Sequence, residues 1–193
     1  MPLIALTGSN GAGKTSLAWM LTTRCRPHYA RLGFADPIRA AVAATLGEPV
    51  DRLFAHPTKD TPHPRAPGGA SPRDLTICWA NAARAAFGDR CWVSALAARA
   101  AQHGPRVVID DLRFRVELNW VRENDGLIVT LGPPPEELPH DEIALFAPRC
   151  PAASEGPEAR QAWLSETTRQ VLEIARGYPP PPWWHRGTAG GTP

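Results

Sequence analysis

Lysine is scarce in this sequence, and arginine supplies nearly all of its positive charge. The only lysines are Lys14 and Lys59, and the 193 residues carry a formal net charge of +2. The chain has no long run of Lys and Arg, which argues against a nucleic-acid-binding protein. The scarcity also draws attention to the two lysines, because one follows a glycine-rich segment and the other lies in a proline-rich one.

The sequence also lacks an apolar segment long enough to span a bilayer, and it shows no secretory signal peptide. Its cysteines have neither a CxxC pattern nor the Cys/His spacing of a metal site. We therefore expect a cytoplasmic protein with no membrane partner, whose cysteines are free, buried thiols. These are Cys25, Cys78, Cys91 and Cys150.

Hydrophobic residues make up 43% of the chain, which is enough for a folded core, and the length predicts one domain over residues 1–176. The 22 prolines and 16 glycines are frequent in two inner loops, at about 48–70 and 132–157, and in the 177–193 tail. The first loop is a candidate substrate loop and the second a candidate lid. The tail is too rich in proline and glycine to fold alone.

A glycine-rich loop, residues 8–15, joins an apolar segment to a helical one in PLIALTGSNGAGKTSLA. Its spacing matches the P-loop pattern in full. In such a loop backbone N–H groups bind phosphate oxygens, Lys neutralises the β- and γ-phosphates, and Thr ligates Mg²⁺. The alternative is a chance glycine-rich turn before a helix. The predicted ATP-binding residues are Gly8, Asn10, Gly11, Ala12, Gly13, Lys14, Thr15 and Ser16.

Strand and helix patterns alternate along the rest of the chain. Strands are expected at PLIALT, YARLGFA, RVVIDD and LIVTL, with helices between them. Asp36 is expected to cap a helix that stops at Gly47, and Ser71 to cap another with Asp74 at the reciprocal position. The pattern predicts an α/β fold, a P-loop kinase-like parallel sheet with helices on both faces. Ligands of such sheets bind at the carboxyl ends of the strands.

The segment VVIDDLRF places two carboxylates at the end of a strand. Asp110 or Asp111 would hold Mg²⁺, directly or through water. The alternative is that these aspartates cap a helix. Arg113 would lie at the same rim, where its planar guanidinium suits a phosphate.

Two classes of P-loop protein are disfavoured by missing segments. The Asn-Lys-x-Asp segment of GTPases and the Ser-Gly-Gly signature of ABC-type ATPases are both absent. The short chain, the two long polar loops and the scattered arginines suit a small-molecule kinase, which must enclose both phosphates and exclude water.

Residues 3–131 also resemble the phage-type deoxynucleoside monophosphate kinases. The shared segments, in order, are LIALTGSNGAGKTSLA, FADPIRAAV, an isolated Lys in a proline-rich loop, SPRDL, FGDRCWV and VVIDDLRFRVELNWVRENDGLIV. The resemblance implies transfer of the γ-phosphoryl group of ATP to a deoxynucleoside monophosphate, with Mg²⁺. If a phage or prophage encodes the protein, the cytoplasm would be that of the bacterial host.

The resemblance also assigns roles to single residues. The catalytic set is Lys14, Arg73, Asp111 and Arg113, and the metal ligands are Thr15, Asp110 and Asp111. The acceptor-binding set is Asp36, Arg39, Lys59, Arg73, Arg84, Trp92, Arg113 and Glu117. Arg149 would be a lid arginine that reaches ATP. Plainer interpretations stay open for Asp36 as a helix cap, Arg73 as a solvated residue and Trp92 as core packing.

Beyond Leu131 the resemblance fades. The family tends to have a His-x-Ser-Glu-like segment and a further strand, whereas here Ser154 and Glu155 run straight into a helix. Three alternatives therefore stay open: another small-molecule kinase, acting on a coenzyme precursor or a sugar acid; a regulatory or DNA-packaging module that binds or hydrolyses ATP; and an inactive homologue. A homodimer is compatible with the sequence.

Overall fold

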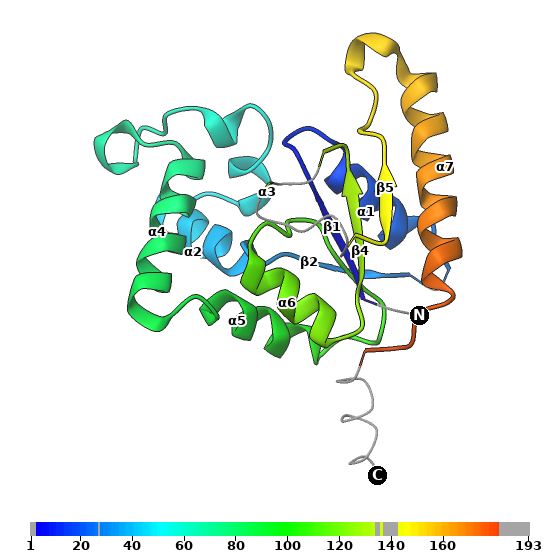
Figure 1. Cartoon of the computed structure of the whole chain (residues 1–193). Coiled ribbons are helices and arrows are strands. Elements are labelled where there is room, and N and C mark those ends of the chain that lie inside the picture. Colours follow the sequence, from blue (N-terminus) through cyan, green and yellow to red (C-terminus); the bar gives the residue numbers. More distant parts are fainter. Residues whose placement is uncertain (1–2, 27, 134–135, 137–142, 182–193) are drawn as a thin grey trace, which may run out of the picture. The chain divides into compact units, whose positions relative to one another are not determined.

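The computed structural model describes residues 3–26, 28–133, 136 and 143–181. The chain divides into two compact units (Figure 1). The first unit contains the residues up to Gly33 and those from Leu96 onward, and the second is Phe34–Ala95. Most of the predicted 177–193 tail lies outside the described residues.

The first unit is built on a five-stranded sheet in the order β2-β3-β1-β4-β5. All of its strand pairs are parallel, which confirms the predicted α/β fold with a parallel sheet. The central strand, β1, pairs through Ile4 with Val108 on one side and Leu127 on the other. The strands are β1 Ile4–Gly8, β2 Ala30–Leu32, β3 Val107–Ile109, β4 Leu127–Leu131 and β5 Leu145–Ala147.

Helices cover both faces of this sheet, as predicted (Figure 1). On one face, Leu17 and Leu21 of α1 and Val171 of α7 pack in the same buried cluster as Ile4 and Leu6 of β1. On the other face, α6 buries one side of its helix. The bounds are α1 Lys14–Thr23, α6 Arg115–Glu123 and α7 Pro157–Ala175.

The second unit is helical. Its buried cluster includes Ile38, Val42, Leu46, Leu53 and Ala80. Its elements are α2 Asp36–Leu46, α3 Val50–Leu53, the 3-10 turns η1 Thr58–Asp60 and η2 Pro67–Gly69, and α4 Pro72–Phe87, while α5 Cys91–Ala100 begins in this unit and ends in the first. The predicted 48–70 loop therefore contains three short helical turns.

Two predicted helix starts had different outcomes. Ser71 caps α4, where its side chain accepts from the Asp74 N–H and the Asp74 carboxylate accepts from the Ser71 N–H. The predicted cap at Asp36 is wrong, because this residue already lies inside α2 and the N-cap is Ala35. The Asp36 carboxylate instead lies 3.5 Å from the Arg39 guanidinium, one turn further along the helix.

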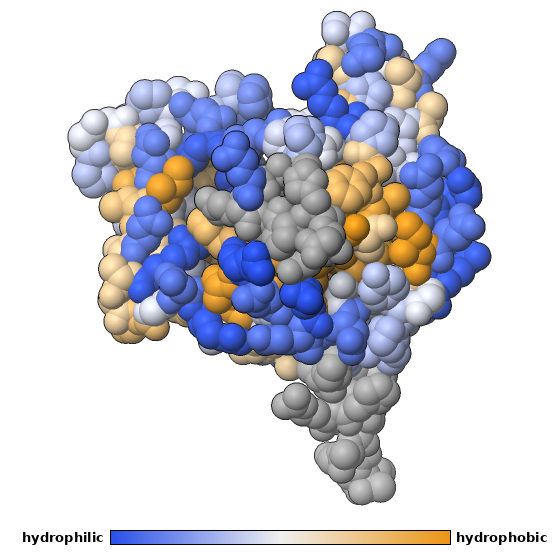
Figure 2. Space-filling model, viewed as in Figure 1, coloured by the Kyte–Doolittle hydropathy of each residue, from blue (hydrophilic) through white to orange (hydrophobic). Residues whose placement is uncertain are grey.

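The predicted 132–157 loop contains a strand that sequence reasoning missed. β5 has three residues, too few for a period-2 pattern, and it forms one edge of the sheet beside β4. Phe146 of β5 is 51% exposed. Figure 2 shows apolar surface over this part of the molecule. A last 3-10 turn, η4 Ala153–Glu155, precedes α7. Residues 134–135 and 137–142 of the predicted lid lie outside the described residues.

The cysteines are all free, but they are not all buried as expected. Cys150 is buried, Cys25 and Cys91 are half-buried, and Cys78 is exposed because it lies on the solvent-facing side of α4. Within the described ranges, no helix combines the length and apolar character needed to cross a membrane.

Candidate functional site

Buried polar side chains of the first unit concentrate at the carboxyl ends of its strands. Among the described residues, the other buried polar side chains of this unit are Thr167 and Thr168 in α7. Burial of a polar or charged group is costly unless the group gains a partner. At this edge of the sheet, the chain therefore keeps buried polar side chains although their burial costs free energy. The five residues there are Thr7 at 0%, Asp110 at 4%, Asp111 at 8%, Glu117 at 3% and Thr130 at 0% exposure.

The glycine-rich loop runs from the end of β1 to the start of α1. Gly8, Gly11 and Gly13 have φ values of +119°, +76° and +98°, which residues with a side chain rarely adopt. At Gly8 there is also no space, because a Cβ would lie 2.2 Å from the Leu131 carbonyl oxygen. The spacing of glycines in the sequence thus reflects the backbone path of this loop.

Lys14, the first residue of α1, folds back over the loop. Its Nζ donates hydrogen bonds to the carbonyl oxygens of Gly8 and Ser9, both at 2.7 Å. Gly13 is the N-cap and offers no side chain to cap the helix, and the first turn contains no acidic residue. The positive end of α1 and the Lys14 cation therefore act together, and both favour an anion at the loop.

The loop is held by a segment far away in the sequence. The Cys150 N–H donates to the Ala12 carbonyl oxygen at 3.0 Å. Trp163 of α7 donates from Nε1 to the Pro148 carbonyl oxygen at 2.9 Å. A Cβ on Gly13 would lie 2.6 Å from Cys150 Cβ and 2.7 Å from Trp163 Cη2. The β5–α7 connection and α7 therefore fix the loop.

Arg149 precedes Cys150 in this connection and is exposed. Its Cβ lies 3.4 Å from the position that a Cβ on Gly132 would occupy, so its backbone passes the end of β4. The structure thus places Arg149, the predicted ATP-side arginine, within the connection that holds the glycine-rich loop.

Asp110 is engaged by Arg31, a residue of β2 that sequence reasoning missed. Arg31 Nε donates to Oδ2 at 3.0 Å, and Nη2 lies 3.0 Å from Oδ1 without hydrogen-bond alignment. The Asp110 side chain is 3% exposed and that of Arg31 is 34% exposed. Both carboxylate oxygens of Asp110 therefore face the guanidinium. The signal in the sequence was an arginine inside an otherwise apolar strand.

Replacing Arg31 with Met should lower the free energy of unfolding by about 2 kcal/mol, because it leaves the buried Asp110 carboxylate without its partner. The loss should be smaller than for a fully buried pair, since Arg31 is one-third exposed. Urea unfolding measures it. The matched control is the double variant Arg31→Met/Asp110→Asn, which removes both charges and should recover most of the stability. Equal destabilisation in the two variants would show that the ion pair is not the cause.

Glu117 and Arg113 are linked at the start of α6. Glu117 Oε2 accepts from the N–H groups of Arg113 and Phe114, at 2.9 and 3.1 Å. Arg113 in turn donates from Nη2 to Asn10 Oδ1 of the glycine-rich loop at 3.3 Å. The structure therefore brings Arg113 to the loop, as the sequence predicted for the rim, while Glu117 holds the backbone that presents it.

In the second unit, two predicted acceptor residues lie on α4 and η1, two elements that contact each other. Arg73 forms an ion pair with Asp60, and Lys59 precedes Asp60 in η1. The Ser71 side-chain and backbone hydrogen bonds lower the pKa of Asp74 in the same turn. A cation at a helix N-terminus is unfavourable by itself, so Asp60 offsets the charge of Arg73.

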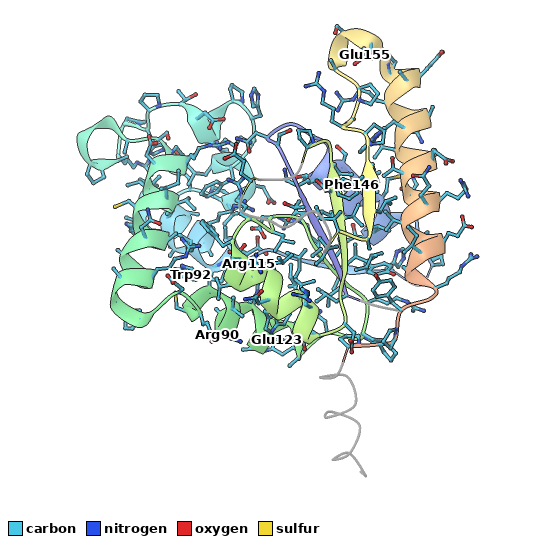
Figure 3. The ribbon with its side chains drawn as sticks, viewed as in Figure 1. Arg90, Trp92, Arg115, Glu123, Phe146 and Glu155 are labelled. Carbon is cyan, nitrogen blue, oxygen red and sulfur yellow. The ribbon has the colours of Figure 1, made fainter. Side chains whose placement is uncertain are left out.

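The other predicted acceptor residues are spread over the second unit. Arg39 lies over the Phe54 ring, 5.9 Å from its centroid, beside Asp36. Arg84 lies in the last turn of α4, roughly 16 Å along the helix axis from Arg73. Trp92 donates from Nε1 to the Ala80 carbonyl oxygen at 3.2 Å and packs on the core of this unit (Figure 3).

Within the part of the chain that the structure describes, no group of three or more His, Cys, Asp or Glu side chains could hold a metal ion. Mg²⁺ needs less, because it is commonly bound by one or two protein oxygens together with substrate phosphates and water. The Thr15 hydroxyl and the Asp111 carboxylate are oxygen donors of that kind, so the donor set fits Mg²⁺.

Comparison of the chain with family models and with curated proteins finds no match. The candidate site is therefore defined by the geometry of the loop and its surroundings.

Proposed function

We propose that this protein is a Mg²⁺-dependent phosphotransferase with a P-loop kinase-like fold, which moves the γ-phosphoryl group of ATP to a deoxynucleoside monophosphate. The observation that carries the proposal is the glycine-rich loop at the carboxyl edge of the parallel sheet. Its three positive-φ glycines, the Lys14 cation and the uncapped start of α1 form a cradle suited to nucleotide phosphates. The choice of acceptor rests on the resemblance of residues 3–131.

On the donor side, the loop N–H groups and Lys14 would bind the phosphates of ATP. Thr15 and Asp111 would hold Mg²⁺, which neutralises charge on the β- and γ-phosphate oxygens. Arg149 would contact the nucleotide from the segment after β5. Asp110 is not assigned to Mg²⁺ here, because the Arg31 guanidinium faces both of its carboxylate oxygens.

On the acceptor side, the resemblance assigns Arg39, Lys59 and Arg73 of the second unit and Arg113 of the first. An acceptor phosphate oxygen is already an anion, so the reaction needs little help from a general base. Catalysis is then mainly positioning and charge neutralisation. The pairing of Arg39 with Asp36 and of Arg73 with Asp60 keeps these guanidinium groups oriented before a phosphate arrives.

The direct test is conversion of ATP to ADP with Mg²⁺ against each deoxynucleoside and ribonucleoside monophosphate, with the product diphosphates resolved by chromatography. We expect a diphosphate from one or more deoxynucleoside monophosphates. ADP formed without an acceptor and stimulated by DNA or a protein would favour a nucleotide-binding module. Transfer only to a coenzyme precursor or a sugar acid would favour another small-molecule kinase.

Replacing Arg113 with Ala should raise the acceptor KM and lower kcat, with a combined loss in kcat/KM of about tenfold to a hundredfold, as for a lost hydrogen bond to a charged group. Steady-state kinetics with varied acceptor measures both. Arg115→Ala is the matched control, because Arg115 is an exposed arginine two residues later on α6 (Figure 3). If Arg113→Ala matched Arg115→Ala in both constants, the role given to Arg113 would be wrong.

A further inference from the structure

Thr7 carries a buried hydroxyl that the roles assigned so far do not use. The residue is 0% exposed and directly precedes Gly8 of the glycine-rich loop. Its Oγ1 has no hydrogen-bond partner among the described residues. Buried polar groups in native proteins are almost always paired, and an unpaired one is costly. A valine would fill the same space without this cost, so the hydroxyl calls for a functional reason.

The sheet register places Thr7 in a row of polar residues. Thr7 pairs with Thr130 of β4, whose own Oγ1 donates to the Gly132 carbonyl oxygen at 3.1 Å. On the other side, Ala5 pairs with Ile109, and the residues two positions further along each chain are Thr7 and Asp111. Side chains two positions apart share a face of a strand. Thr7 therefore shares a face with Thr130. The pairing of β1 with β3 ends at Ala5 and Ile109, and Asp111 follows two residues beyond the end of β3.

The neighbouring aspartate has a different setting. Arg31 pairs with Val108 in the register of β2 and β3, and Asp110 is two positions after Val108. Continuing the alternation of β3 past its last residue, Ile109, would place Asp110 on the face where Arg31 holds it and Asp111 on the face of Thr7. The row on that face would then join the orphaned Thr7 hydroxyl to Asp111, a predicted Mg²⁺ ligand.

We propose that Thr7 is a positioning residue whose hydroxyl donates a hydrogen bond to the Asp111 carboxylate and orients it toward Mg²⁺ bound with a nucleotide. The proposal rests on one part of the proposed function, the binding of a Mg²⁺-nucleotide by the loop. It does not depend on which acceptor receives the phosphate. Groups that orient a metal ligand contribute strongly to metal affinity, and their loss typically costs ten- to a hundredfold. The Thr7 hydroxyl is a donor that could supply this orientation, and it is shielded from water.

The test compares ATP binding by calorimetry with Mg²⁺ and with a chelator, together with urea unfolding, in four variants. Thr7→Val and Thr7→Ala remove the hydroxyl, and the second serves if the first fails to fold. Thr7→Ser keeps the hydroxyl. Thr168→Val is the matched control, because Thr168 Oγ1 is likewise buried without a partner among the described residues, but lies in α7.

We expect Thr7→Val to lose about tenfold or more of the Mg²⁺-dependent gain in ATP affinity, while its stability is unchanged or higher. Thr7→Ala should show the same loss of the Mg²⁺ effect. Thr7→Ser should keep the wild-type Mg²⁺ effect, and so should Thr168→Val. A purely structural role would lower stability and leave the Mg²⁺ effect intact.

Three outcomes would overturn the proposal: a wild-type Mg²⁺ effect in Thr7→Val, loss of the effect in Thr7→Ser as well, or equal loss in Thr168→Val. The proposed function is tested separately. If the wild-type protein binds ATP with a Mg²⁺ effect but transfers no phosphate to any nucleoside monophosphate, the acceptor assignment fails and the role of Thr7 stands. If the wild-type protein does not bind ATP, both fail.

Discussion

Lys14→Ala should reduce phosphoryl transfer by about a thousandfold or more in kcat/KM, the scale on which loss of a cation from the transferred phosphate acts. Lys14 is the basic residue of the glycine-rich loop, and its Nζ already lies 2.7 Å from the carbonyl oxygens of Gly8 and Ser9. Without it, the loop itself would oppose the phosphate charge only through its N–H groups and the α1 dipole. The fold should survive, because the lost hydrogen bonds lie at a partly exposed loop and contribute about 1 kcal/mol each.

Two measurements separate the effect of Lys14→Ala on ATP binding from its effect on phosphoryl transfer. Calorimetry gives the affinity for ATP, and steady-state kinetics gives kcat and the acceptor KM. Lys59→Ala is the matched comparison, because it makes the same chemical change at the other lysine of the chain, in η1 of the second unit. It should raise the acceptor KM and leave the ATP affinity unchanged. If Lys14→Ala transferred phosphate with the kcat/KM of the wild-type protein, the glycine-rich loop would have no part in the reaction.

The features that the sequence predicted well are local. The capping box of Ser71 and Asp74 and the left-handed stop at Gly47 each depend on a few consecutive residues. The glycine-rich loop is local in the same sense, since its positive-φ positions are those where glycine occurs. Even so, local reasoning failed at Asp36, where an ion pair with Arg39 inside α2 replaced the expected cap.

The features that the sequence could not predict depend on strand order. Arg31 and Asp110 are 79 positions apart, and they meet only because β2 and β3 are neighbours in the sheet. Trp163 reaches Gly13 only because α7 packs on the same face as α1. β5 has only three residues, too few to reveal a hydrophobic period in the sequence. Its place at the sheet edge is set by its pairing with β4.

Gly13→Ala should be strongly disruptive, lowering the free energy of unfolding by about 3–5 kcal/mol through backbone strain and overlap. At Gly13 the φ value is +98° and a Cβ would lie 2.6 Å from Cys150 Cβ and 2.7 Å from Trp163 Cη2. Gly11→Ala is the matched control, because its φ is +76° but no atom lies within 4 Å of a Cβ there. It should cost only about 1–2 kcal/mol, the penalty of the left-handed backbone.

Urea unfolding of the two alanine variants, with ATP affinity measured on each, isolates the contribution of space from that of backbone angle. The difference between them reports how firmly Cys150 and Trp163 hold the loop. Adding Trp163→Leu to Gly13→Ala removes one of the two overlaps, so the combined loss should be smaller than the sum of the single losses. Equal effects of Gly11→Ala and Gly13→Ala would contradict this, because they would mean that α7 does not constrain the loop to which the nucleotide phosphates are assigned.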